Sequence, residues 1–530
     1  MLFAGGTVFD GHRYRGALDV RTDGDRIVEV GRGLDHRGED VIDCAGRLLA
    51  PGFIDAHVHL IQGGLERRRC DLSGFSTRED YLRIIADYAR ANPGLGWILG
   101  GGWSMTAFPG GTPTAADLDR IVPDRPVFLP NRDHHGAWVN SRALELAGID
   151  RNSPDPAHGR FERDEAGRPT GTLHESAMGA VSRLIPETTE EEYYAALLTG
   201  QTYLHSLGVV GWQDAIVGGY AGMDDPGPCY AQAAQRGDLT GYVVGALWWD
   251  RDLGGEQIDY LLERRDRWTH GRFRATSIKV MQDGVAENGT AAMSMPYLDR
   301  CGHATDNTGL SFVDPQALKS HVARLDAAGF QMHVHAIGDR AVSEALDALS
   351  AGNPANRHHI AHLQLVRPDD IARFAAYGVA ANLQALWACY DEQLIDLTLP
   401  FVGPERAEWH YPFGDLHRAG ARLVCGSDWP VSTPDPLAAI HTAVTRTAYG
   451  EQGRAGTEPF LPGQALNLEA AFAAYTSGSA WVNHRDDAGR VEPGCVADLV
   501  VLDRDVFIEE PDEIGAAKVT STWIDGTQVY

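Results

Sequence analysis

The sequence predicts an α/β fold in which a (β/α)8 TIM barrel carries a small β-sandwich domain built from both termini and an insertion over the barrel mouth. Three observations predict it. Units of helix and short apolar strand recur through the middle of the 530-residue chain, whereas both ends hold only short strands and turns. Polar residues follow several of the apolar strands, and a (β/α)8 barrel gathers such residues at one end.

Both ends of the chain consist of short apolar segments separated by turn residues, as at 497–503 and 519–526. Neither end holds enough strands to close a β core alone. We therefore expect one discontinuous β domain made of residues 1–50 and 485–530, which leaves 51–484 for the barrel.

The clearest helix–strand unit lies near residue 320. Asp314 followed by Pro315 is typical of a helix start and Gly329 of a helix end, and an apolar strand comes next. Units at 368–383 and 413–425 repeat this layout. Such repetition is what a barrel of alternating helices and strands requires.

An insertion is predicted near the start of the barrel. The stretch from His59 to Lys279 is far longer than three strand–helix units need, so a segment at about 65–185 is expected to pack over the barrel mouth. Thr188 and Glu191 have the spacing of a capping box and predict the next barrel helix. A doubly wound sheet is the structural alternative, and the spacing of polar residues described below argues against it.

Composition excludes some classes of function. With 46 Lys and Arg against 73 Asp and Glu, the net charge is −27, which disfavours binding to nucleic acid. The start of the chain has no basic segment followed by an apolar one, and no window has the length and apolarity of a membrane span. Seven cysteines without a Cys-x-x-Cys pair are typical of free thiols. A cytoplasmic protein without membrane partners is expected.

Histidines stand at the end of the first barrel strand. His57 and His59 are two residues apart, so both imidazoles lie on one side of the strand and can reach one cation. Further polar residues follow later strands: Lys279, His335, His362 and Asp428. His335 and His362 are one unit apart, His362 and Asp428 are two units apart, and Lys279 precedes His335 by one unit plus an insertion. Lys279 is unusual because a cation within a buried strand is costly unless it is paired or chemically altered. The pattern indicates one polar centre at the carboxyl ends of separate strands.

Six segments carry a family resemblance. They are residues 51–59, 126–129, 139–144, 335–341, 426–430 and 493–500. With these segments the chain resembles the amidohydrolase superfamily of metal-dependent hydrolases. Within that superfamily it resembles the YtcJ-like branch, which includes N-substituted formamide deformylase.

The resemblance implies a binuclear metal site. His57, His59 and Asp428 would bind one ion, and His335 and His362 the other, with Lys279 bridging the two as its N-carboxylate. Two zinc ions per chain are the first expectation, and manganese, iron or cobalt also suit this ligand set. In the family the ligand stands directly before Ala-Ile-Gly-Asp, which assigns His335 and leaves His333 as a core or supporting residue.

The implied activity is hydrolysis of a non-peptide C–N bond, first of all in an N-substituted amide or formamide, by a metal-activated hydroxide. Asp428 would act as general base and then acid, with Lys279 and His135 as the other catalytic residues. Residues expected to contact a small-molecule substrate are Trp103, His135, Asp283, Glu287 and Trp429. The segment 286–308 is long enough to cover the site as a lid.

Two other functions compete with this hypothesis. A deaminase or cyclic-amide hydrolase of the same superfamily would often use a single metal, and the bridging Lys279 argues against it. A metal-binding scaffold without catalysis is disfavoured because all six expected ligand positions are filled. The sequence has no Gly-x-Ser-x-Gly elbow and no phosphate loop, so no nucleotide or flavin cofactor is predicted. A homodimer is the ordinary expectation for such an enzyme.

Overall fold

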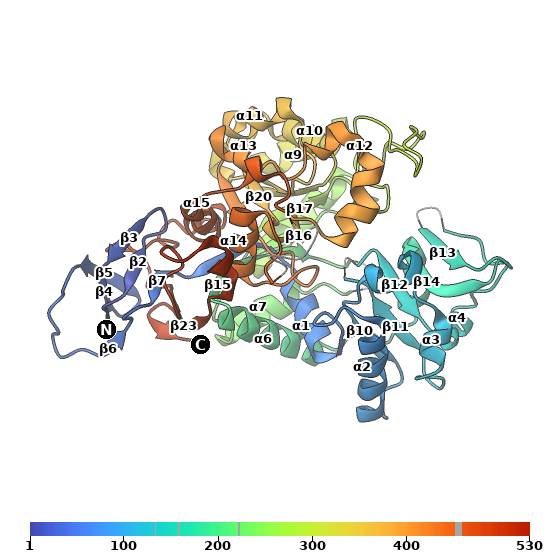
Figure 1. Ribbon diagram of the computed structural model, residues 1–530, viewed down its shortest axis with the longest axis horizontal. Helices are drawn as coiled ribbons and strands as arrows, with labels where there is room; N and C mark the ends of the chain where they lie inside the picture. Colours follow the sequence, from blue (N-terminus) through green and yellow to red (C-terminus); the bar gives the residue numbers. More distant parts are fainter. Residues whose placement is uncertain (133, 157–158, 221–222, 451–457) are drawn as a thin grey trace.

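The computed structural model describes residues 1–132, 134–156, 159–220, 223–450 and 458–530. Figure 1 shows three parts in a row: strands from both termini at one end, the barrel in the middle and an inserted sheet at the other end. No helix in these described residues is both long and apolar enough to cross a membrane.

Eight parallel strands form the barrel, in the order β21-β20-β19-β18-β17-β16-β15-β8. They are β8 (Phe53–Val58), β15 (Val209–Val217), β16 (Tyr242–Trp248), β17 (Phe273–Met281), β18 (Gln331–Ala336), β19 (His359–His362), β20 (Ala380–Leu383) and β21 (Leu423–Cys425). All are buried over most of their length, as parallel strands covered on both faces must be. The predicted (β/α)8 barrel is confirmed.

Helices cover the outside of the barrel (Figure 1). The principal ones are α1 (Leu60–Arg68), α6 (Glu190–Ser206), α7 (Gly227–Arg236), α8 (Ile258–Trp268), α9 (Pro315–Ala327), α10 (Asp339–Leu349), α11 (Pro368–Tyr377), α13 (Phe413–Arg418) and α14 (Pro436–Thr445). The Asp314 carboxylate caps α9 by accepting from the amides of Gln316 and Ala317. Gly378, at φ 67°, ends α11 in the left-handed conformation that glycine adopts without strain.

The capping box of α6 lies one residue later than the sequence suggested. Thr189 and Glu192 form it, not Thr188 and Glu191. The Thr188 hydroxyl instead accepts a hydrogen bond from Arg69 (2.9 Å). Because Thr188 contacts the inserted region in this way, the next threonine caps the helix.

The two termini share one sheet, in the order β24-β23-β22-β7-β2-β3. A second sheet, β5-β4-β1-β6, comes from the N-terminal residues alone. The strands are β1 (Leu2–Ala4), β2 (Thr7–Phe9), β3 (Tyr14–Ala17), β4 (Asp19–Asp23), β5 (Arg26–Gly31), β6 (Val41–Asp43), β7 (Leu48–Pro51), β22 (Leu499–Leu502), β23 (Val519–Ile524) and β24 (Thr527–Gln528). Phe3 of the second sheet packs edge-on against Trp523 of the first, at 5.3 Å between ring centroids, within a common core.

The inserted region has its own mixed sheet, in the order β13-β14-β12-β11-β10-β9. Its elements are β9 (Cys70–Asp71), α2 (Arg78–Ala91), β10 (Ile98–Gly101), α3 (Ala115–Asp119), β11 (Val127–Pro130), β12 (Gly136–Val139), α4 (Ser141–Leu146), β13 (Gly159–Arg163) and β14 (Pro169–Glu175). Trp103, Phe108 and Trp138 meet in a separate aromatic core beneath α2. This region therefore has a core of its own beside the carboxyl end of the barrel.

Candidate metal centre

Three polar side chains meet where the first and last barrel strands end. The Nε2 atoms of His57 and His59 lie 3.1 and 3.0 Å from Asp428 Oδ1. One ligand atom from each of the three residues lies within 4.8 Å of the others. His57 and Asp428 are buried, and His59 is partly buried. Two imidazoles and one carboxylate at this spacing form a ligand set for a divalent cation.

Asp55, which sequence reasoning did not single out, holds this centre together. Its carboxylate accepts from the amides of His57 and Ser427 at 3.0 Å each and from the Ser427 hydroxyl at 2.5 Å. The Asp428 amide donates to the His57 carbonyl (2.7 Å), which bridges the two edge strands of the barrel sheet. Burial raises the pKa of Asp55 to about 7 against the effect of these hydrogen bonds. The signal for this residue was a carboxylate inside an otherwise apolar strand.

The other three predicted ligands join the same cluster. Lys279 Nζ lies 3.3 Å from His57 Nε2. The ring centroids of His335 and His362 are 4.4 Å apart, and His362 lies 4.8 Å from His57. All six residues therefore converge at the carboxyl ends of five strands.

The protonation states of this cluster suit a metal. Burial lowers the pKa of His57 to about 3 and those of His335 and His362 well below the ordinary value, so their ring nitrogens keep lone pairs. Burial alone would raise the pKa of Asp428, but His57 and His59 hold it well below its usual range. Burial also lowers the pKa of Lys279 to about 8. Among the described residues, the buried His362 Nδ1 has no hydrogen-bond partner. These donors fit a divalent cation.

His333 lies beneath the centre and not in it. Its Nε2 is 2.9 Å from His57 Nδ1, on the far side of the ring from Asp428. A partner at Nδ1 leaves His57 Nε2 directed at the centre, which is how proteins orient metal-binding histidines.

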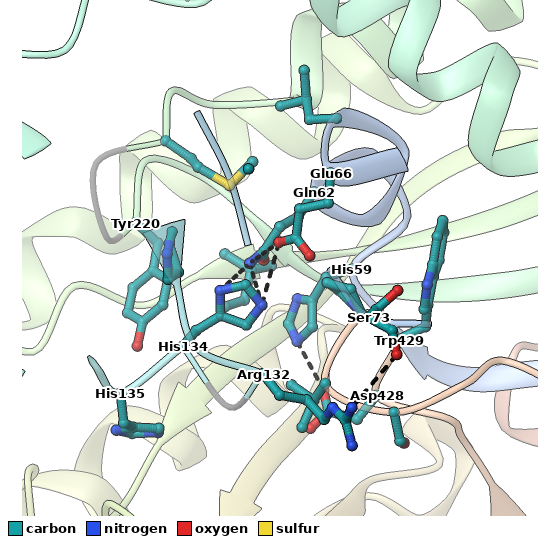
Figure 2. A pocket seen from close by; sticks show the side chains of 18 of the residues that line it. His59, Gln62, Glu66, Ser73, Arg132, His134, His135, Tyr220, Asp428 and Trp429 are labelled. Atoms are coloured by element: carbon teal, nitrogen blue, oxygen red, sulfur yellow. Dashed lines mark hydrogen bonds and ion pairs between the residues drawn. The ribbon is translucent and has the colours of Figure 1, made fainter. Parts of the chain in front are cut away.

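A pocket of about 1100 Å³ opens above the six residues, between the strand ends and the inserted region. The barrel contributes Glu287, Trp387, Tyr411 and Trp429 to its walls, and the inserted region contributes Leu99, Phe128, Arg132, His134 and His135. Figure 2 shows part of this lining, with His59 and Asp428 beside residues of the inserted region.

Family comparison agrees with this geometry, because the sequence pattern of the Amidohydrolase family matches residues 40–530. The chain belongs to the amidohydrolase family. It is 29% identical to YtcJ of Bacillus subtilis, over 92% of this chain and 90% of that protein. It is 26% identical to N-substituted formamide deformylase of Arthrobacter pascens, over 97% and 95% of the two chains. The crystal structure of a metal-dependent hydrolase from Pyrococcus furiosus matches with a TM-score of 0.73 at 27% identity, covering 95% and 99%. The resemblance drawn from the motifs is confirmed.

Three residues that the sequence placed near substrate line the pocket of this amidohydrolase. His135 does so with its Nδ1 3.0 Å from Glu175 Oε2. Glu287 accepts a hydrogen bond from the Thr398 hydroxyl (3.1 Å). Trp429 packs closely on Gly63 of α1, where an added Cβ would lie 2.6 Å from the indole.

Trp103 and Asp283 lie elsewhere, outside the described residues that line the pocket. Trp103 is buried in the core of the inserted region, where its indole N–H donates to the Leu129 carbonyl (2.7 Å). The Asp283 carboxylate is fully buried and accepts from three backbone amides. Both were placed near the pocket because they lie near strand ends. The Trp103 indole binds the backbone instead, and the Asp283 carboxylate binds the backbone with its Oδ1 3.5 Å from His335 Nε2.

The segment 286–308 lies against the barrel as a wall. Met293 and Tyr297 are buried with Ile337 and Leu365, and Arg406 donates to the carbonyl of Met295 (2.7 Å). Glu287, near its start, is the residue that reaches the pocket.

His134 was missed by sequence reasoning. It has φ 62°, an unfavourable conformation for a residue with a Cβ, and its Nε2 lies 3.3 Å from Glu66 Oε1. Gln62, one turn before Glu66 on α1, contacts the same ring (Figure 2). Burial lowers the pKa of His134 to about 3 and raises that of Glu66 to about 8. The available signal was the pair of glutamine and glutamate at helical spacing directly after His59.

Proposed function

We propose that this amidohydrolase is a metal-dependent hydrolase of a non-peptide C–N bond, with an N-substituted amide or formamide as substrate. The observation that carries the proposal is the convergence of His57, His59 and Asp428 at the floor of a large pocket. The similarity to a protein named N-substituted formamide deformylase supports the substrate class, and the similarity to a metal-dependent hydrolase supports the metal.

The six converging residues would hold the metal. His57, His59 and Asp428 would bind one ion and His335 and His362 a second, with Lys279 shared between them as an N-carboxylate. Zinc is the first choice, and manganese, iron or cobalt suit the same donors. When bound, such an ion lowers the pKa of water and polarises a carbonyl group.

Asp428 is proposed to move the proton. Its carboxylate stands at the pocket floor, where it can take a proton from an attacking water and deliver it to the departing nitrogen. An amine leaves far more readily once protonated, so this delivery is required for cleavage. Asp428 is held for this role by the hydrogen bond that its backbone N–H donates to the His57 carbonyl and by the neighbouring Asp55–Ser427 contacts.

The pocket walls would bind the rest of the substrate. His135 lines the pocket and would hold the carbonyl oxygen, and the aromatic faces of Trp387, Trp429 and Tyr220 would offer apolar surface for an N-substituent. The same surface would exclude water from the reacting bond.

The test combines metal content with turnover. Elemental analysis of protein purified without added metal is expected to give about two ions per chain. Hydrolysis of N-benzylformamide should be lost on chelation and restored by zinc. One ion without amide hydrolysis, together with release of ammonia from ring substrates, would overturn the proposal in favour of a deaminase. Absence of metal binding even after zinc is supplied would favour a scaffold without catalysis.

A further inference from the structure

Behind His135 lies a carboxylate that nothing in the proposed chemistry uses. Glu175 ends strand β14, which pairs antiparallel with β12 directly after His135. Its Oε2 and Oε1 lie 3.0 and 3.1 Å from His135 Nδ1, and its amide donates to the His135 carbonyl (3.0 Å). His135 lines the pocket, and Glu175 is absent from the described lining residues. The carboxylate therefore supports the ring from behind.

Glu175 is also held from the barrel. The Asn288 side-chain amide donates to its Oε1 (2.6 Å), and Asn288 belongs to the segment that follows the strand of Lys279. The backbone of Glu175 has φ 51° and ψ −127°, a conformation that residues with a Cβ rarely adopt, so the surrounding contacts must hold it. Burial would raise the pKa of Glu175, but the hydrogen bonds from His135 and Asn288 hold it below the usual value, so the group is a carboxylate.

We propose that Glu175 is a positioning residue that acts through His135. By accepting from Nδ1, it fixes the orientation and tautomer of the imidazole and directs the opposite edge of the ring to the substrate. Because Asn288 belongs to the barrel, the orientation of His135 also depends on how the inserted region packs against the barrel. In many enzyme sites a carboxylate that accepts from one ring N–H orients the imidazole in the same way. The inference rests on the proposed function, because His135 must meet the substrate for its orientation to affect turnover.

The same sheet supplies a matched control. Glu162 Oε2 lies 3.2 Å from His174 Nε2, so a second glutamate–histidine pair joins β13 to β14. Neither residue is among those that line the pocket. Removing the Glu162 carboxylate should disturb the sheet as much as removing that of Glu175, without reaching the substrate.

The first experiment is a double-mutant cycle with His135→Ala, Glu175→Gln, Glu175→Ala and the combination of His135→Ala with Glu175→Ala. Each Glu175 variant should lower kcat by about tenfold to a hundredfold and change KM little, with metal content unchanged. In the His135→Ala background the Glu175 substitution should cost less than about twofold. Glu162→Gln should also stay within about twofold of wild type. Additive losses, or an equal loss in Glu162→Gln, would overturn the proposal.

A second measurement needs no substrate. In the imidazole nitrogen-15 spectrum, the His135 signals are identified by their absence from His135→Ala. We expect the pattern of a proton on Nδ1 in wild type and its loss or shift in Glu175→Ala, with no change in Glu162→Gln. An unchanged His135 pattern in Glu175→Ala would refute the positioning role even if no amide is hydrolysed. Failure of wild type to turn over amides would instead refute the proposed function alone.

Discussion

Substitution of Asp283 tests whether its buried carboxylate holds the backbone after strand β18 in place. Its Oδ1 accepts from the Ile337 amide (3.0 Å), and its Oδ2 accepts from the amides of Ala292 (2.9 Å) and Gly338 (2.8 Å). Ile337 and Gly338 come directly after the strand that ends with His335 and Ala336, so this carboxylate ties the loop after the proposed ligand His335 to the segment beside it.

The substitution Asp283→Asn has a cost that follows from these contacts. The amide oxygen can replace Oδ2, but the amide nitrogen then faces the Ile337 N–H, and two donors meet. One charge-assisted hydrogen bond is lost and the two facing donors are left without an acceptor, while relief from burying a charge offsets part of the loss. The net destabilisation is about 3 kcal/mol. A chain of 530 residues unfolds with an entropy of about 1.1 kcal/mol/K, so the unfolding temperature should fall by about 3 °C.

Thermal unfolding of metal-free protein measures this shift. The control is Asp299→Asn, because Asp299 also accepts from two backbone amides, those of Cys301 and His303, but is exposed. Its unfolding temperature should change by less than about 1 °C. If Asp283→Asn unfolds at the wild-type temperature and only KM rises, Asp283 contacts substrate and its role in holding the backbone is refuted.

Three further outcomes are expected. Asp428→Asn should lower kcat by about a hundredfold or more in a protein that stays folded, measured by amide hydrolysis and circular dichroism, and near-native turnover would contradict its role as base. Because burial and the nearby charge of Asp71 raise the pKa of Glu66 from 4.5 to about 8, the folded state binds this proton more tightly than the unfolded state. The difference in free energy of unfolding between wild type and Glu66→Gln should therefore shift against wild type as the pH rises from about 4.5 to about 8, and stay constant above that pH. Urea unfolding at several pH values measures this difference. Gly426→Ala would place a Cβ 2.5 Å from the backbone nitrogen of His57, so it should reduce bound metal, measured by elemental analysis.

The barrel could be predicted from sequence because its signals are local. The Asp314–Pro315 start of α9 and the Gly378 end of α11 follow from backbone chemistry within a few residues. The six metal-ligand candidates could be found because barrel topology brings strand ends together whatever the loops do. The capping box of α6 was misplaced by one residue, since its register depends on a contact between Thr188 and the distant Arg69.

The pocket walls were harder to predict because they depend on how the inserted region meets the barrel. Nothing local distinguishes His135, which faces the pocket, from Trp103, which is buried in the core of the same region. His134 and Glu66 come from segments that meet only after this docking, so the glutamine and glutamate at helical spacing after His59 do not indicate which residue they contact. Residues whose role is set by long-range packing need the structure.

The hydrogen bonds between Asp55 and Ser427, which join the first and last barrel strands, have a consequence for the synthesis and folding of this protein. Asp55 and Ser427 lie 372 residues apart along the chain, yet their contact sets the position of Asp428 beside His57. A ribosome delivers the two histidines early and the aspartate late, so a partly synthesised or prematurely ended chain lacks the full ligand set. Completion of the barrel and acquisition of reactivity are thus one event, and truncated products are expected to be inert rather than poorly controlled catalysts.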